Sequence, residues 1–272
     1  MDAISLKQIS GLPLFLDDSG RLTFGQDLCI EEILYRRVDE LTAVAMTPEE
    51  CQGNPETAYW MYNGVYLRSD QAALEKIPLR YELTYLPART LGGEFIKTHG
   101  HRHYPEAKSG MQYAEICEVL YGIAHFIFKK SINDQPLVSS VFYIEAYPGE
   151  KVLFPPGLDH CTINPADSPL LFSDVIARGV KGDYSYFRKN QGAAYWEVQT
   201  ASETSFIPNP RYGDVPPIVK RPVHCYPEFS ITKEIPLYQA FLETYGRGWE
   251  FLLDPGLFRS TFPDLVESFS HP

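Results

Sequence analysis

The hydrophobic residues of this chain follow two patterns, and the change between them comes near Tyr59. In residues 28–46 the apolar positions recur at mixed helical spacing, which favours a helix. After Tyr59 the chain becomes a series of short apolar alternations bounded by Gly, Pro, Asn or Asp. These segments are residues 59–67, 80–88, 94–103, 113–122, 124–129, 141–150, 151–157 and 170–177. Their form is typical of strands in an antiparallel sandwich or barrel, so we predict one β-domain over residues 59–198.

The segments on either side of this domain are expected to be helical or irregular. Thr47 and Glu50 have the spacing of a capping box, which predicts a second helix start. Residues 235–254 open with Pro236 in a first-turn position and predict a short helix that ends near Gly246 or Gly248. We therefore expect an all-β barrel with an N-terminal extension, residues 1–58, and a C-terminal extension, residues 199–272, both packed on the barrel.

The composition agrees with this fold class. At 272 residues and 44% hydrophobic, the chain can bury a sizeable core. Its 22 prolines, 19 glycines and 14% aromatic residues favour many short strands joined by tight turns over a helical bundle.

Charge and cysteine content exclude several classes of protein. The formal net charge of −11 argues against a nucleic-acid-binding surface and against an anionic membrane as partner, because both need a basic surface. The five cysteines are odd in number and form no C-x-x-C pair, so we expect neither a disulfide framework nor a zinc ribbon. The N-terminus lacks signal-peptide features and no apolar run has the length of a membrane span, so we expect a cytoplasmic protein.

Three of the seven histidines fall within residues 99–103. In an extended strand His101 and His103 project from one face, His99 shares that face, and Arg102 points away. Two imidazoles on one face can share a metal ion. The H-x-H pair alone is weak support for this, because histidines at that spacing are common on strands without a ligand.

Two further segments strengthen the metal hypothesis. In the strand predicted over 113–122, Glu115 shares a face with Cys117 and Val119, and a carboxylate buried there would need a cation or a hydrogen-bond partner. The alternative is that Glu115 points to solvent. Further along, Gly149 makes one turn, Pro155 and Gly157 make the next, and His160 follows at the start of a new strand.

Together these spacings resemble the two motifs of the cupins. The resemblance implies a jelly-roll barrel that holds one divalent metal ion through His101, His103, Glu115 and His160. Imidazole and carboxylate ligands suit Fe, Mn, Ni or Zn, and four protein ligands leave positions open for substrate oxygens. The interval between His103 and Glu115 is longer than usual, so a loop over residues 104–112 must be accommodated.

Residues 64–198 resemble, more specifically, the cupin-type phosphoglucose isomerases, through a K-T-x-G-H-x-H phrase that begins at Lys97. The resemblance implies metal-dependent isomerisation of glucose 6-phosphate and fructose 6-phosphate, a step of glycolysis and gluconeogenesis, in a homodimer. It assigns the substrate phosphate to Thr84, Thr98 and the Gly100 backbone, with Tyr66 as the matching upstream tyrosine. Glu115 would be the catalytic base of a proton transfer through an enediol, and a metal-assisted hydride shift is the competing mechanism.

Three positions depart from this family's pattern. The chain has Cys117 and Ile176 where the family has tyrosines, and Gly182 where it has a histidine. These changes keep other hypotheses open: an isomerase or epimerase of another sugar phosphate, a non-catalytic sugar-phosphate-binding protein, or an Fe-dependent dioxygenase. The last of these leaves Thr84 and Thr98 unexplained.

Overall fold

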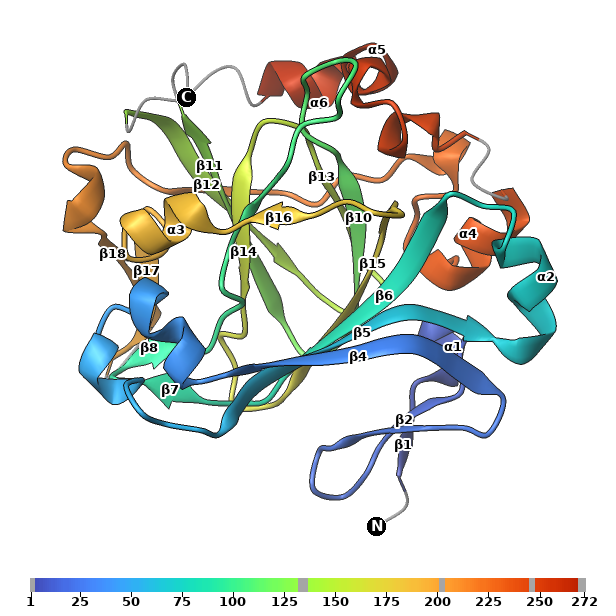
Figure 1. Ribbon diagram of the computed structural model, residues 1–272, viewed down its shortest axis with the longest axis horizontal. Coiled ribbons are helices and arrows are strands. Elements are labelled where there is room, and N and C mark those ends of the chain that lie inside the picture. Colours follow the sequence, from blue (N-terminus) through green and yellow to red (C-terminus); the bar gives the residue numbers. More distant parts are fainter. Residues whose placement is uncertain (1–2, 132–136, 201–203, 245–247, 269–272) are drawn as a thin grey trace.

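Two antiparallel sheets form the body of the protein and face each other (Figure 1). The computed structural model describes residues 3–131, 137–200, 204–244 and 248–268. The larger sheet has the order β13 (Lys151–Phe154), β10 (Glu115–Tyr121), β15 (Leu170–Ala177), β6 (Leu79–Leu86), β5 (Thr57–Leu67), β4 (Leu28–Arg37). The facing sheet has the order β14 (Asp159–Ile163), β11 (Ala124–Ser131), β12 (Val138–Ala146), β19 (Val219–Arg221). The predicted all-β barrel is confirmed.

Three smaller sheets lie around the barrel. They consist of β1 (Ile4–Ser5), β2 (Leu14–Leu16) and β3 (Leu22–Phe24); of β16 (Gly182–Asp183) and β9 (Arg102–His103); and of β18 (Thr204–Pro208), β17 (Tyr195–Gln199), β8 (Glu94–Phe95) and β7 (Thr90–Leu91). The α-helices are α1 (Lys7–Ser10), α2 (Gln71–Leu74), α3 (Ser185–Lys189), α4 (Leu237–Thr244), α5 (Phe258–Thr261) and α6 (Pro263–Ser268). The 3-10 turns are Asp39–Val44, Pro48–Glu50, Arg68–Asp70, Pro210–Tyr212, Pro227–Phe229, Glu250–Leu252 and Pro255–Leu257.

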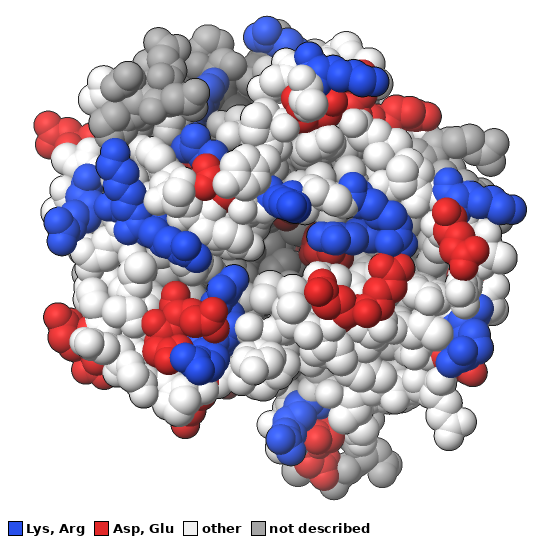
Figure 2. Space-filling model, viewed as in Figure 1, with Lys and Arg blue, Asp and Glu red and all other residues white. Residues whose placement is uncertain are grey.

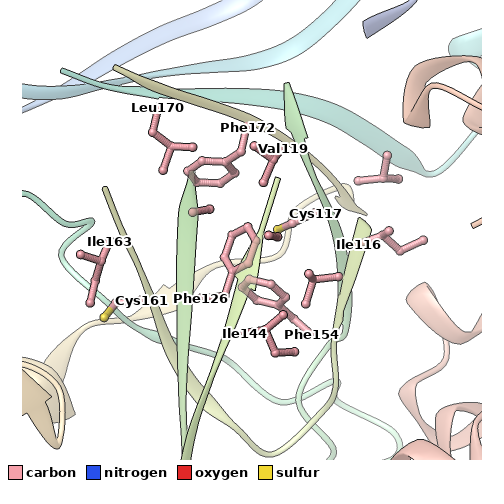
Figure 3. Packing of buried hydrophobic residues seen from close by; sticks show 14 of the residues in the cluster. Ile116, Cys117, Val119, Phe126, Ile144, Phe154, Cys161, Ile163, Leu170 and Phe172 are labelled. Atoms are coloured by element: carbon pink, nitrogen blue, oxygen red, sulfur yellow. The ribbon is translucent and has the colours of Figure 1, made fainter. Parts of the chain in front are cut away.

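The aromatic core lies between the two large sheets (Figure 3). Phe126 of β11 packs against Phe154 of β13 and Phe172 of β15, with ring centroids 5.1 and 5.9 Å apart. All three side chains are at least 95% buried, and edge-to-face contacts of this kind add to the hydrophobic gain from burial. Phe154 and Phe172 also line the cavity described below, so the core and the cavity share the inner faces of the two sheets.

The helix predicted over residues 28–46 is wrong. Leu28–Arg37 is strand β4, and only Asp39–Val44 forms a 3-10 turn. Strand β4 pairs with β5 along its length, and this long-range pairing, with β-branched Ile30 and Ile33, outweighs the local helical spacing. At Thr47 a single 3-10 turn begins, without a hydrogen bond from the Thr47 side chain.

The C-terminal extension packs on the barrel through buried polar contacts. The helix predicted after Pro236 is present as α4, and its expected end near Gly246 lies outside the described residues. The Leu237 N–H at its start donates to the buried Glu118 carboxylate of β10 (2.8 Å). Lys151 Nζ donates to the same carboxylate (2.6 Å) and to the Thr232 carbonyl (2.7 Å). These contacts tie the extension to the larger sheet.

Both extensions also add a strand to the barrel. β4 forms one edge of the larger sheet, and β19 pairs in parallel with β12 at the edge of the facing sheet. On the face shown in Figure 2, basic and acidic side chains are interspersed around a central hollow. No helix of the described residues is long and apolar enough to cross a membrane.

Candidate metal centre and substrate cavity

Two segments bring the three candidate histidine ligands together inside the barrel. His101 and His160 form an isolated antiparallel bridge in which each backbone N–H donates to the other residue's carbonyl (3.0 Å). His103 follows in β9, two residues on, so it projects to the same side as His101. The positive φ of Gly100 (+76°) turns the chain just before this segment. The strand predicted over 94–103 is therefore interrupted, but the shared orientation of His101 and His103 is retained.

The imidazoles of His101, His103 and His160 meet closely enough to share one ion. Each offers one ring nitrogen, and these three atoms lie within 4.8 Å of one another. The rings of His101 and His160 have centroids 4.6 Å apart. Nε2 of His160 is fully buried and has no hydrogen-bond partner among the residues that the structure describes, which is costly in a protein interior. A cation at this point would satisfy that atom, so these residues fit a metal ion.

Glu115 lies beside this group, at the start of β10. One of its carboxylate oxygens is 3.1 Å from His103 Nε2, and the other accepts a hydrogen bond from the Cys117 thiol (3.2 Å). The other ring nitrogen of His103 lies 2.8 Å from the Tyr113 carbonyl, which fixes the ring orientation. Glu115 is buried, and the alternative in which it points to solvent is wrong.

The surroundings keep two of the imidazoles neutral and the carboxylate ionised. Burial lowers the pKa of His101 and His160 well below the usual range, and neighbouring imidazoles add to the effect. Burial also acts to raise the pKa of Glu115, but the hydrogen bond and charge of His103 outweigh it and lower the pKa. Neutral imidazole and ionised carboxylate are the forms that bind metal ions.

A cavity of about 370 Å³ opens onto these residues. Thr84, Thr98 and Gly100, the expected phosphate contacts, line it together with the three histidines and Glu115. Tyr66 is not among the lining residues. It lies on the opposite face of β5 from Met61 and Asn63, which do line the cavity.

Thr98 and Gly100 are suited to an anion for separate reasons. The Thr98 hydroxyl oxygen accepts the Thr162 N–H (3.0 Å), so its own O–H is free to donate. At Gly100 a Cβ atom would collide with the Phe187 ring, and the positive φ independently favours glycine. Glycine is therefore required here by the packing of Phe187 and by the backbone conformation, and its backbone borders the cavity.

Sequence reasoning missed several residues of the cavity. The Tyr59 hydroxyl accepts the His99 N–H (3.1 Å), and Tyr59 lines the cavity where Tyr66 does not. The alternation of β5 was the available signal, since Tyr59, Met61 and Asn63 share one parity. Also missed were Glu82 of β6 and Asp174 of β15, each a carboxylate within a largely buried strand.

The three positions that depart from the resembling family lie at this site. Cys117 is buried beside Glu115, and burial raises the pKa of its thiol well above the usual range, so it is a neutral thiol. Ile176 and Gly182 line the cavity. A Cβ at Gly182 would come within 2.8 Å of the His101 ring, so this backbone packs directly on a candidate ligand.

Comparison with known proteins gives one family. The glucose-6-phosphate isomerase (GPI) family model matches residues 35–208. No curated protein sequence matches the chain. Similar solved structures include a variant of Bacillus subtilis oxalate decarboxylase (16% identity, 45% of this chain, 26% of that chain, TM-score 0.32). Another is oxalate oxidase in complex with the substrate analogue glycolate (14% identity, 36% of this chain, 41% of that chain, TM-score 0.28).

The chain spans about a quarter of the length of the oxalate decarboxylase that it resembles. The family model, in contrast, covers more than half of this chain, from within β4 to the end of β18, and so includes every residue of the histidine group and the strands that line the cavity. The chain belongs to the glucose-6-phosphate isomerase family.

Proposed function

We propose that the protein interconverts glucose 6-phosphate and fructose 6-phosphate with one divalent metal ion, Fe, Mn, Ni or Zn, per chain. The observation that carries this proposal is the group of His101, His103 and His160, with an unpartnered buried nitrogen, at the wall of a cavity that threonine side chains also line. The carboxylate of Glu115, hydrogen-bonded to His103, completes the ligand set.

The cavity divides into two ends in this proposal. At one end the histidines and Glu115 hold the metal ion, which when bound would polarise the C1 and C2 oxygens of the sugar as a Lewis acid. At the other end the Thr84 and Thr98 hydroxyls and the Gly100 backbone bind the phosphate. Tyr59 replaces Tyr66 as the tyrosine of this end, because its hydroxyl lies against the His99 N–H (3.1 Å).

Glu115 is the base of the reaction. Its carboxylate takes the proton from C2 of glucose 6-phosphate and returns it to C1, by way of an enediol. The Cys117 thiol, which donates to that carboxylate (3.2 Å), holds it in place. Glu115→Gln removes the base but keeps an oxygen at the same position.

The experiment that tests the base is a comparison of wild type with Glu115→Gln. We expect kcat to fall by about 10²–10⁴-fold, the usual contribution of a positioned base, while fructose 6-phosphate still binds. Metal content, measured on the same samples, separates loss of the base from loss of the ion. A Glu115→Gln variant that contains metal and turns over at the wild-type rate would remove Glu115 from the mechanism.

A second candidate is isomerisation or epimerisation of another sugar phosphate. Cys117, Ile176 and Gly182, at the cavity or beside Glu115, are the specific observation that favours it. A panel of hexose and pentose phosphates, assayed on metal-loaded protein, decides between the two.

We also propose a cytoplasmic homodimer. Ile33 and Tyr35, exposed on edge strand β4, support a second copy pairing there, which sedimentation would test.

A further inference from the structure

A row of polar side chains crosses the inner face of the larger sheet. The strand register places Asn63 opposite Glu82, Glu82 opposite Asp174, and Asp174 opposite Cys117. Four neighbouring strands, β5, β6, β15 and β10, each contribute one residue. Asn63, Glu82 and Asp174 all line the cavity. The proposed reaction, as described so far, uses none of them.

Asp174 is the unusual member of this row. Only 7% of its surface is exposed, and among the described residues its carboxylate takes part in no hydrogen bond or ion pair, although its backbone pairs with Glu82 and Cys117 in the sheet. Glu82 beside it differs, because it is paired with Arg80. A buried carboxylate without a partner carries a large desolvation cost, and Asp174 faces the cavity, where a ligand could offset that cost.

The position of Asp174 lies between the two ends of the cavity. Thr84, at the phosphate end, is two residues beyond Glu82 on β6, about 7 Å along the strand. Glu115, at the metal end, is two residues before Cys117, which is opposite Asp174. A hexose 6-phosphate that spans these ends places its middle carbons over Asp174.

We propose that Asp174, with Glu82 beside it, determines specificity by binding the hydroxyl groups on C3 and C4 of the open sugar chain. This inference rests on the proposed function. Hydroxyls are the donors that the middle of such a substrate offers, and a carboxylate oxygen is an acceptor for them. Cys117, opposite Asp174 on β10, and Ile176, two residues along β15, offer no comparable acceptor for a sugar hydroxyl.

The test compares three substrates across three proteins. The substrates are glucose 6-phosphate and its 3-deoxy and 4-deoxy analogues, and the proteins are wild type, Asp174→Ala and Asp174→Asn. We expect wild type to lose about tenfold to a hundredfold in kcat/KM on the analogue that lacks the bound hydroxyl. On glucose 6-phosphate, kcat/KM of Asp174→Ala should fall by a similar factor relative to wild type. On the analogue that lacks the bound hydroxyl, Asp174→Ala and wild type should have nearly the same kcat/KM. Asp174→Asn, which keeps an acceptor and a donor, should recover part of the loss.

Asp167→Asn, the same change at an exposed turn residue, is the control and should match wild type on every substrate. Metal content and melting temperature show that each variant is folded. Equal activity of wild type on glucose 6-phosphate and both analogues overturns the inference. The inference is also overturned if the fold-loss in kcat/KM of Asp174→Ala on the deoxy analogue equals the product of two separate fold-losses, that of the variant on the parent substrate and that of wild type on the analogue. Such independent effects would mean that Asp174 and the hydroxyl are not in contact.

A failure of the proposed function is recognised separately. If wild type turns over no glucose 6-phosphate, that function fails, and the same matrix is measured as Kd for fructose 6-phosphate and its deoxy analogues. If removal of the hydroxyl raises Kd in wild type but not in Asp174→Ala, the result still supports Asp174 as the binding group. Absence of any binding overturns the inference as well. Preference for a 3-amino or 4-amino analogue over the parent sugar phosphate would make Asp174 an ammonium site and also overturn it.

Discussion

The three histidines of residues 99–103 have different surroundings, which divides them by role. His101 and His103 face His160, whereas the ring of His99 contacts Arg188 and the Gly100 carbonyl. Alternation along the chain predicts the shared orientation of His101 and His103 correctly, even though the segment is not one continuous strand. The contact of His99 with α3 depends on a residue far along the chain, so the local pattern could not reveal it.

Replacing His160 tests the histidine group. His160→Ala removes one of three clustered nitrogens, so we expect the purified protein to lose most of its metal, with an affinity at least about a hundredfold lower. Inductively coupled plasma mass spectrometry measures the metal content. His224→Ala, which changes an exposed histidine of the C-terminal extension, should leave it unchanged. Equal metal content in wild type and His160→Ala would exclude His160 as a ligand.

Gly100 provides a second test at this scale, with Gly110 as its matched control. Both have positive φ, +76° and +68°, but an added Cβ collides with Phe187 only at Gly100. We expect Gly110→Ala to cost about 1 kcal/mol of unfolding free energy from φ strain, and Gly100→Ala to cost at least 1–3 kcal/mol more from the added clash. Thermal denaturation of both variants measures the difference. Equal losses of unfolding free energy in the two variants would mean that the Phe187 side chain moves aside without a cost in stability.

At the scale of the element, most strands of the barrel follow from the alternation of the sequence, but their partners do not. The strands over 59–67, 80–88, 113–122 and 170–177 are present as β5, β6, β10 and β15. β4 was missed because its pairing with β5 joins distant segments of the chain. The assignment of Tyr66 rests on the family resemblance, whereas strand parity brings Tyr59 to the cavity.

The contact between β10 and the C-terminal extension can be tested at Glu118. Its carboxylate is fully buried and holds both Lys151 and the Leu237 N–H, so Glu118→Ala leaves a buried cation without its charged partner. We expect a loss of about 3–5 kcal/mol in unfolding free energy and faster proteolysis of the extension. The control is Glu150→Ala, which removes a partly exposed carboxylate paired with Lys233. It should lower the unfolding free energy by about 0–1 kcal/mol. A Glu118→Ala protein as stable as the Glu150 variant would show that this contact does not hold the extension.

The whole molecule combines an acidic net charge with a cavity that we propose binds a small anion. The net charge of −11 does not prevent this, because hydroxyl and N–H donors and a bound cation act at short range. Composition and periodicity predict an antiparallel sandwich or barrel, and the resemblance to the cupins implies the metal group. They could not predict that carboxylates of β6 and β15 would share the cavity, because that depends on strand order.

Metal binding should stabilise the entire fold. The histidine group joins β9 to β14, segments that separate on unfolding, so an ion bound only by the native state raises stability by mass action. At a free metal concentration about a hundred times Kd, the gain is about 2.7 kcal/mol. Differential scanning calorimetry of chelated and reconstituted protein should show a higher melting temperature for the latter. A melting temperature independent of metal would mean that the ion is not held by the folded barrel.

The central claim is tested most directly by coupled assay of glucose 6-phosphate isomerisation before chelation, after chelation and after reconstitution with Fe, Mn, Ni or Zn. Turnover should disappear with EDTA and return with at least one of these metals, and His160→Ala should remain inactive throughout. Turnover that survives complete removal of metal would contradict the account, as would a metal-loaded wild type that binds fructose 6-phosphate but converts none of it.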